Sequence, residues 1–139
     1  MDIERARLGL RRLGLLGSGL TFGSIALASL AVPEKVAAQY AYSVGTPDSF
    51  NEFHAVFTGF WLGLTLLMFT AARRWEDRRL GDLAGAAIGL QALARLLSIA
   101  LHGAPSASFT SAMLGELVTA ILILQGGPIA AARASGRPP

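Results

Sequence analysis

Residues 81–103 read GDLAGAAIGLQALARLLSIALHG, an apolar segment that is long enough to cross a bilayer and yet carries a guanidinium group. Four polar residues of this segment share one face at helical spacing: Gln91, Arg95, Ser98 and His102. An arginine surrounded by hydrocarbon needs an opposite charge or water. The predicted partner of Arg95 is Glu116, which lies in the next apolar segment.

The composition places the chain among membrane proteins. Of its 139 residues, 53% are hydrophobic and 15% are charged, which is too apolar a balance for an ordinary soluble domain. Cysteine is absent, so disulfides, thiol catalysis and cysteine-ligated metals are excluded. The basic residues form no continuous face, so the expected partner is the lipid bilayer and not nucleic acid.

The predicted fold is all-α: a polytopic membrane protein with an antiparallel four-helix transmembrane bundle in a single domain, residues 1–139. Four apolar segments support it, at approximately residues 10–32, 51–72, 81–102 and 109–127. The first could instead be a secretory signal, but it exceeds the ~7–15 apolar residues of such signals. A short surface helix is expected from Pro33 to Tyr42, and Asp48 or Ser49 could cap the second span.

The distribution of basic residues predicts the orientation. Of 12 Lys and Arg, ten lie in the N-terminal leader, the turn between the second and third spans, and the C-terminal tail. Lys35 alone lies in a loop on the opposite side. By the positive-inside rule, both termini are expected in the cytoplasm, which requires an even number of spans.

Counting along the helices places Arg95 and Glu116 at the same depth. Each lies seven residues from the outer end of its span, which is roughly 10 Å below the outer boundary. Glu52 and His54 begin the second span at this outer mouth, and Glu52 is expected to point into the bundle above the pair. Small residues predict close helix packing at five glycines: Gly59, Gly63, Gly81, Gly85 and Gly89.

Several segments carry a family resemblance: residues 52–59 (EFHAVFTG), 94–98 (ARLLS), 102–105 (HGAP) and 116–118 (ELV). They resemble the small bacterial inner-membrane proteins of domain-of-unknown-function family 4345, which are themselves similar to DoxX-like four-helix proteins. The resemblance implies four helices, an inner-membrane location and an outward-facing cluster of Glu52, Arg95 and Glu116, but no reaction. The chain departs from the family at His54 and Thr58, where Arg and Gly look more usual, and this alters the charge balance of the outer mouth.

The polar residues admit several roles. The predicted cluster of two acids and one arginine forms either a clamp between helices or a pocket for an anion, a lipid headgroup or a quinone, with Gln91 and Ser98 as further polar groups. His54 and His102 could ligate a metal or haem, or make the mouth sensitive to pH. Interfacial histidines without such a role are more common, so neither a metal nor a cofactor is expected.

Three classes of function are compatible with these features. The expected one is a small integral membrane protein without catalysis, either an accessory subunit of a larger membrane complex or a binder of a lipid-like or quinone-like molecule. The first alternative is a small permease or channel that acts as a homo-oligomer. The second alternative is a redox-linked membrane enzyme of the DoxX type.

Overall fold

The computed structural model describes residues 3–75 and 77–125, and every regular element in that part of the chain is helical. The elements are α1 (Ile3–Ala31), α2 (Pro33–Gln39), α3 (Pro47–Phe53), the π-helix η1 (His54–Phe60), α4 (Trp61–Arg73), α5 (Arg78–His102) and α6 (Ala107–Leu124). Because α3, η1 and α4 follow one another without a break, they form one long helix. The prediction of an all-α fold is confirmed.

Within residues 3–75 and 77–125, four helices are long and apolar enough to cross a membrane: Ala6–Ala31, Pro47–Arg73, Arg78–His102 and Ala107–Leu124. The shortest has 18 residues and extends about 27 Å, close to the ~30 Å hydrocarbon core of a bilayer. The protein is therefore a small multi-pass membrane protein. The last two residues predicted for the fourth span, 126–127, and the arginines of the C-terminal tail lie outside the described residues.

The helix starts use local signals that the sequence predicted only in part. The second span begins before its predicted start, with Thr46 as its N-cap. The Thr46 hydroxyl accepts a hydrogen bond from the Ser49 backbone N–H at 3.2 Å, and the Ser49 hydroxyl accepts one from the Thr46 N–H at 2.9 Å. This capping box takes the place of the predicted cap at Asp48 or Ser49. Asp77 caps α5 by accepting from the Arg79 N–H at 3.1 Å.

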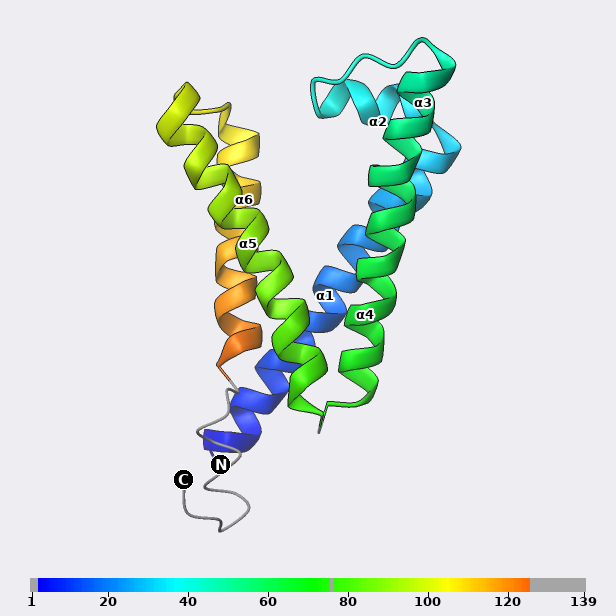
Figure 1. Ribbon diagram of the computed structural model, residues 1–139. Helices are drawn as coiled ribbons and strands as arrows, with labels where there is room; N and C mark the ends of the chain where they lie inside the picture. The colour runs from blue at the N-terminus through cyan, green and yellow to red at the C-terminus, as the bar shows by residue number, and fades with distance from the viewer. Residues whose placement is uncertain (1–2, 76, 126–139) are drawn as a thin grey trace.

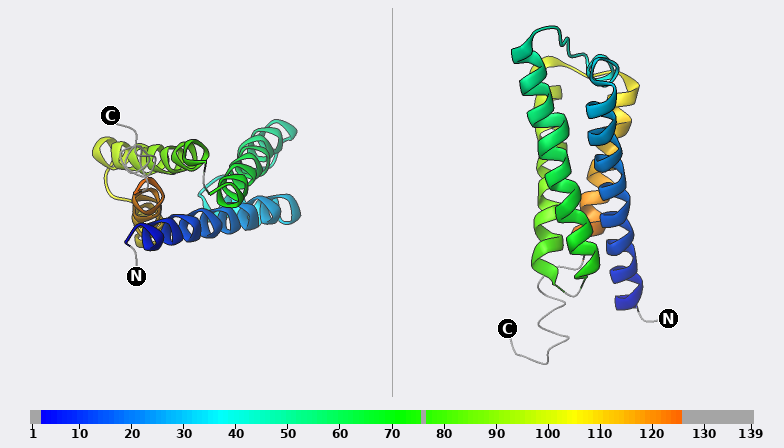
Figure 2. Two further views of the ribbon diagram at one scale, coloured as in Figure 1. Left: turned by 90° about the horizontal axis from the view of Figure 1, so that it is seen from below. Right: turned by 90° about the vertical axis from the view of Figure 1, so that its right-hand side faces the viewer.

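The four spans form two antiparallel pairs that meet at one end of the molecule and separate toward the other (Figure 1). We call them the α1–α4 arm, which includes α2, α3 and η1, and the α5–α6 arm. Contacts are most extensive within each arm and fewer between the arms. The arms meet at the converging end, beside the N-terminal part of α1 and the α4–α5 turn. They separate toward the diverging end, which carries α2 and the α5–α6 connection (Figures 1 and 2).

Ile123 of α6 occupies the junction at the converging end. Its side chain is fully buried between glycines of two other spans. A Cβ on Gly14 of α1 would lie 3.1 Å from Ile123 Cγ1, and a Cβ on Gly85 of α5 would lie 2.9 Å from Ile123 Cγ2. The two glycines therefore let three helices approach around a single side chain.

Aromatic rings hold the α1–α4 arm together. Phe53, Phe57 and Trp61 recur every four residues along the second span and are buried. The centroid of Phe57 lies 4.6 Å from that of Phe53 and 5.1 Å from that of Trp61, while Trp61 meets Phe22 of α1 edge-on at 5.4 Å. Tyr40, just after α2, contacts Phe57 at 4.9 Å and Trp61 at 5.8 Å. These contacts fold α2 over the diverging end of the arm.

The second span packs through its aromatic residues, and the prediction that Gly59 and Gly63 form its packing face is wrong. Gly59 and Gly63 are exposed, and a Cβ on Gly63 would meet nothing within 4 Å. Large rings offer far more contact area than glycines, so the rings face α1 and the glycines face outward. The close approach between α1 and α4 instead uses glycines of α1, with Gly19 against Phe69 and Gly23 against Thr65.

We predict that Gly85→Ala destabilises the bundle, because its methyl group would lie 2.9 Å from Ile123 and 3.0 Å from Leu124. Overpacking of this kind costs about 1–3 kcal/mol, which a lower melting temperature in detergent would report. Gly63→Ala is the matched control and is expected to leave the melting temperature unchanged or raised, since alanine favours a helix over glycine. Equal effects of the two substitutions would show that the Ile123 junction does not hold the arms.

Candidate functional site

Arg95 and Glu116 form an ion pair within the α5–α6 arm. Arg95 donates from Nε to Glu116 Oε2 at 2.9 Å and from Nη2 to Glu116 Oε1 at 3.2 Å, so the contact is bidentate. Gln91, one turn earlier on α5, donates from Nε2 to Glu116 Oε1 at 2.8 Å. The structure thus places Glu116 beside Arg95 and adds Gln91 as a third member. We call these three residues the polar cluster.

The antiparallel hairpin of α5 and α6 explains this geometry. A short connection joins the two helices, so side chains at equal distances from it face each other, which is the relation between Arg95 and Glu116. Only 28% of the Arg95 side chain and 14% of the Glu116 side chain are exposed. An unpaired charge buried to this extent would destabilise the fold. The Arg95–Glu116 pair has no net charge, and both carboxylate oxygens of Glu116 accept hydrogen bonds.

A cavity of about 810 Å³ lies beside the polar cluster, with walls from both arms. Its volume falls within the ~300–1,000 Å³ that is typical of ligand pockets. The polar cluster contributes its charged and amide groups, and Trp61 and Tyr40 reach it from the α1–α4 arm. Small or hydroxyl-bearing residues are frequent on its α1 and α6 walls: Gly14, Gly17, Ser18, Thr21, Ser108, Ala112, Gly115 and Thr119.

Tyr40 links the two arms at the diverging end. Its ring centroid lies 6.1 Å from that of Phe109 on α6. Burial raises the pKa of the Tyr40 phenol, an effect that the charge of Arg95 opposes and that of Glu116 reinforces. The phenol is therefore protonated at neutral pH and can donate a hydrogen bond into the cavity that it lines. No local signal marks Tyr40 as a cavity residue, because its position depends on how α2 folds back.

Glu52 does not join the polar cluster. It is exposed on α3, is not part of the cavity wall, and has no hydrogen bond or ion pair with any residue that the structure describes. Its predicted inward orientation is wrong because Phe53 and Phe57 occupy the inward face of this span. The candidate site therefore draws its charges from α5 and α6 alone.

His54 begins a chain of hydrogen bonds between η1 and α1. His54 Nδ1 lies 3.2 Å from Thr58 Oγ1, which lies 2.7 Å from Ser29 Oγ, and Ser29 donates to the Ala26 carbonyl at 2.8 Å. Because the Ser29 proton goes to a carbonyl, Thr58 donates to Ser29 and His54 donates to Thr58. A neutral His54 therefore carries its proton on Nδ1. Thr58 is the link between the imidazole and α1.

The two histidines lie on different arms. His102 is exposed at the end of α5, whereas His54 belongs to η1 on the α1–α4 arm (Figure 1). Over the described ranges, no group of three or more His, Cys, Asp or Glu residues is placed to hold a metal ion. Ser98 is also exposed, and together with Arg95 it lines a second cavity of about 140 Å³ near the α5–α6 connection.

The glycines of α5 face two different spans. Gly85 and Gly89 face α6, and Gly81 faces the side chain of Arg11 on α1. A Cβ on Gly81 would overlap the Arg11 guanidinium, so a larger residue at this position would displace that side chain.

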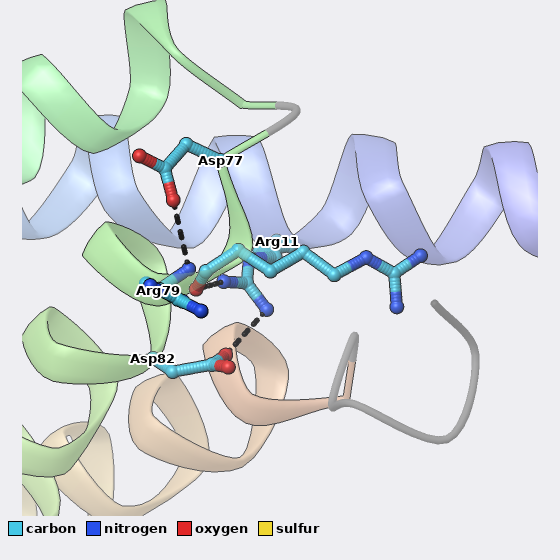
Figure 3. Close-up of polar contacts among 5 residues, drawn as sticks. Arg11, Asp77, Arg79 and Asp82 are labelled. Carbon is cyan, nitrogen blue, oxygen red and sulfur yellow. Dashed lines mark hydrogen bonds and ion pairs between the residues drawn. The ribbon is translucent and has the colours of Figure 1, made fainter. Parts of the chain in front are cut away.

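Arg11 is a buried cation at the converging end, and its role was not predicted from the sequence (Figure 3). Only 4% of its side chain is exposed. Arg11 donates from Nη1 to Asp82 Oδ1 at 2.8 Å and from Nη2 to the Arg78 carbonyl at 2.7 Å. The ion pair therefore ties α1 to the first two turns of α5, close to the point where the arms meet.

Helical phase is the sequence signal that distinguishes Arg11. Leu15 and Phe22 follow it at four and eleven residues, so Arg11 lies on the buried face of α1, whereas Arg12 lies on the exposed face. Arginines that precede an apolar span are usually interpreted only as an orientation signal. That interpretation treats Arg11 and Arg12 alike, although Arg11 is buried and Arg12 is exposed.

The comparisons with known proteins identify one family. The sequence profile described as Domain of unknown function (DUF4345) matches residues 10–126. The chain belongs to this family. The match runs from α1 through α6 and includes both ion pairs and the cavity, and it confirms the family membership predicted from the sequence. No curated protein and no solved structure matches the chain.

We predict that Arg95→Ala and Glu116→Ala each lower the melting temperature in detergent, since each leaves a buried charge without its partner. The expected loss is about 1–3 kcal/mol per substitution. The exchanged variant Arg95→Glu/Glu116→Arg is expected to recover part of that loss, because the charges can pair again. If the exchange is as damaging as the sum of the single variants, direct pairing does not stabilise the hairpin.

We predict that Arg11→Ala lowers the melting temperature and that Arg12→Ala leaves it unchanged. Removing Arg11 deprives Asp82 of its ion-pair partner and takes away one hydrogen bond to the Arg78 carbonyl, a loss of about 1–3 kcal/mol. Arg12 is the next residue in the chain, carries the same charge and is exposed. Its substitution therefore controls for the general effect of removing a cation from this segment. A similar response from both variants would mean that the ion pair with Asp82 contributes nothing specific.

Proposed function

We propose that this small membrane protein binds an amphiphilic molecule of the bilayer, lipid-like or quinone-like, in the cavity between its arms. The observation that carries the proposal is a cavity of about 810 Å³ whose wall is largely apolar and contains one polar cluster. Leu13, Phe22 and Ile88 provide apolar surface for a hydrocarbon tail, while the cluster can receive a polar head.

The proposed role is binding rather than catalysis. Glu116 is the acid in the described cavity wall, and its carboxylate accepts three hydrogen bonds from Arg95 and Gln91. A carboxylate held in this way is a poor general base or nucleophile, since its lone pairs are directed at fixed donors. Its use is to orient the Arg95 guanidinium.

The cavity geometry favours binding over permeation. Ile123, the buried Arg11 and the glycines around them close the bundle at the converging end. A molecule that reaches the polar cluster would have to break this junction in order to continue through the bundle. The arms separate only toward the diverging end (Figure 1).

We further propose that the protein resides in a bacterial inner membrane with both termini in the cytoplasm. In support, exposed arginines gather at the converging end, where Arg12, Arg73, Arg74 and Arg79 lie, whereas Lys35 lies on α2 at the diverging end. The positive-inside rule then assigns the converging end to the cytoplasm. In this orientation the cavity and its polar cluster face the periplasm.

An accessory subunit of a larger membrane complex is a second candidate function. One observation favours it: Gly59 and Gly63 lie on an outward face of the second span beside the exposed Val56 and Phe60. A surface of this kind allows a helix of another protein to approach closely. The two functions are compatible, since the face and the cavity lie on different sides of the helix.

Quenching of Trp61 fluorescence tests the binding proposal. Trp61 lines the cavity, and the second tryptophan of the chain, Trp75, is removed by Trp75→Phe. We expect methyl dibromostearate, whose bromines quench tryptophan, to quench Trp61 saturably in detergent. Gly115→Leu fills the cavity from α6, where a Cβ would meet nothing within 4 Å, and is expected to weaken quenching about tenfold.

Gly63→Leu is the matched control for this experiment. It places the same side chain on a glycine that is equally open but lies outside the cavity wall, so quenching should be unchanged. Quenching that rises linearly with the probe, or that Gly115→Leu and Gly63→Leu affect equally, would reflect contact with bulk detergent and would refute a binding site in the cavity.

A further inference from the structure

We infer that the head of the bound molecule is uncharged and carries a hydrogen-bond acceptor such as a carbonyl oxygen. This inference rests on the proposed function and narrows its ligand. The shared chemistry is a neutral carbonyl on a long apolar chain, as found both in acylglycerols and in isoprenoid quinones. The argument uses the charges of the cavity, its remaining hydrogen-bonding groups and its apolar wall.

The charges of the cavity wall cancel. Among the described residues that line it, Arg95 and Glu116 carry the formal charges, and they pair with each other at 2.9 and 3.2 Å. An anionic head beside Arg95 would also face the Glu116 carboxylate, with no further cation to balance it. A cationic head would face Arg95 in the same way. Either charge would lose its hydration on entering an apolar cavity, so an uncharged head is favoured.

Arg95 offers the cavity N–H donors that Glu116 does not use. A guanidinium carries five N–H donors, and Arg95 uses one from Nε and one from Nη2 on Glu116. Its other N–H groups have no acceptor among the residues that the structure describes. The Tyr40 hydroxyl, also on the cavity wall, adds a donor, and the Gln91 amide oxygen is an acceptor for any hydroxyl on the ligand. This set fits a head with an acceptor oxygen.

The apolar part of the cavity wall can contact the hydrocarbon tail of the bound molecule. Ile25 and Leu122 line the cavity on α1 and α6, and Phe109 lies near its diverging end. Leu10 and Leu13 continue this wall on α1 and are exposed at the surface of the bundle, where acyl chains of the bilayer would surround them. A tail longer than the cavity can therefore extend along α1 into the bilayer while its head stays at the polar cluster.

The test compares two probes that share a tail and differ in the charge of the head. In the Trp75→Phe protein, methyl dibromostearate is neutral with an ester carbonyl, and dibromostearyl sulfate is permanently anionic. We expect the ester to quench Trp61 at concentrations at least about tenfold lower than the sulfate. Equal or tighter binding of the sulfate overturns the inference and leaves the binding proposal standing. Absence of saturable quenching by either probe refutes the proposed function itself.

A charge variant strengthens the comparison. Glu116→Gln removes the negative charge of the cluster and keeps the size of the side chain, so Arg95 becomes an uncompensated cation. We expect the sulfate to bind at least about tenfold more tightly to this variant than to the parent, and the ester to change little. An unchanged preference contradicts the charge argument. The comparison of probes in the parent protein does not depend on whether this variant folds.

Competition distinguishes the two sources of the carbonyl. Unlabelled dioleoylglycerol and decylubiquinone are each titrated against bound methyl dibromostearate. Recovery of Trp61 fluorescence measures displacement of the ester by dioleoylglycerol. Decylubiquinone itself quenches tryptophan, so for this competitor the released ester is measured by mass spectrometry. The one that displaces at lower concentration identifies the class. Displacement by both at similar concentrations supports the shared chemistry, and displacement by neither overturns it.

Discussion

A buried charge in an apolar helix bundle must meet an opposite charge, and this requirement governs where the four helices lie. In the part of the chain that the structure describes, two ion pairs meet this requirement. Arg11 and Asp82 join the two arms at the converging end, and Arg95 and Glu116 join the two helices of a single arm. Because the second pair needs nothing from the opposite arm, the α1–α4 arm is free to diverge at that level. The cavity lies beside this pair, with walls from both arms.

The arms contact each other at the converging end and, through one aromatic pair, at the diverging end. At the converging end, Ile123 fits between Gly14 and Gly85, beside the Arg11–Asp82 pair. At the diverging end, the Tyr40 ring reaches Phe109. Between these levels, the polar cluster faces a largely apolar wall, so one region combines hydrogen-bonding groups with surface for a hydrocarbon chain. The site is thus a consequence of where the arms touch.

Local pattern was sufficient to predict the spans and the partner of Arg95. Span length and hydropathy are properties of single segments, and the depth of Arg95 and Glu116 follows from counting along two helices joined by a short connection. The inward position of Glu52 was wrong because choosing between a glycine face and an aromatic face requires knowledge of the neighbouring helix. Arg11 was missed because its phase, and not its type, separates it from Arg12. The cavity and Tyr40 depend on the fold of the whole chain.

The location of the Arg95–Glu116 pair within one hairpin also bears on how the chain enters the membrane. An arginine at the centre of a helix costs about 2.5–3.5 kcal/mol when that helix inserts by itself, and Arg95, seven residues before the end of α5, incurs a cost of the same kind. The carboxylate that offsets this cost comes 21 residues later, on the helix that returns across the bilayer. Glu116 can therefore stabilise α5 in lipid only once α6 has been made, which favours insertion of the two helices as a unit.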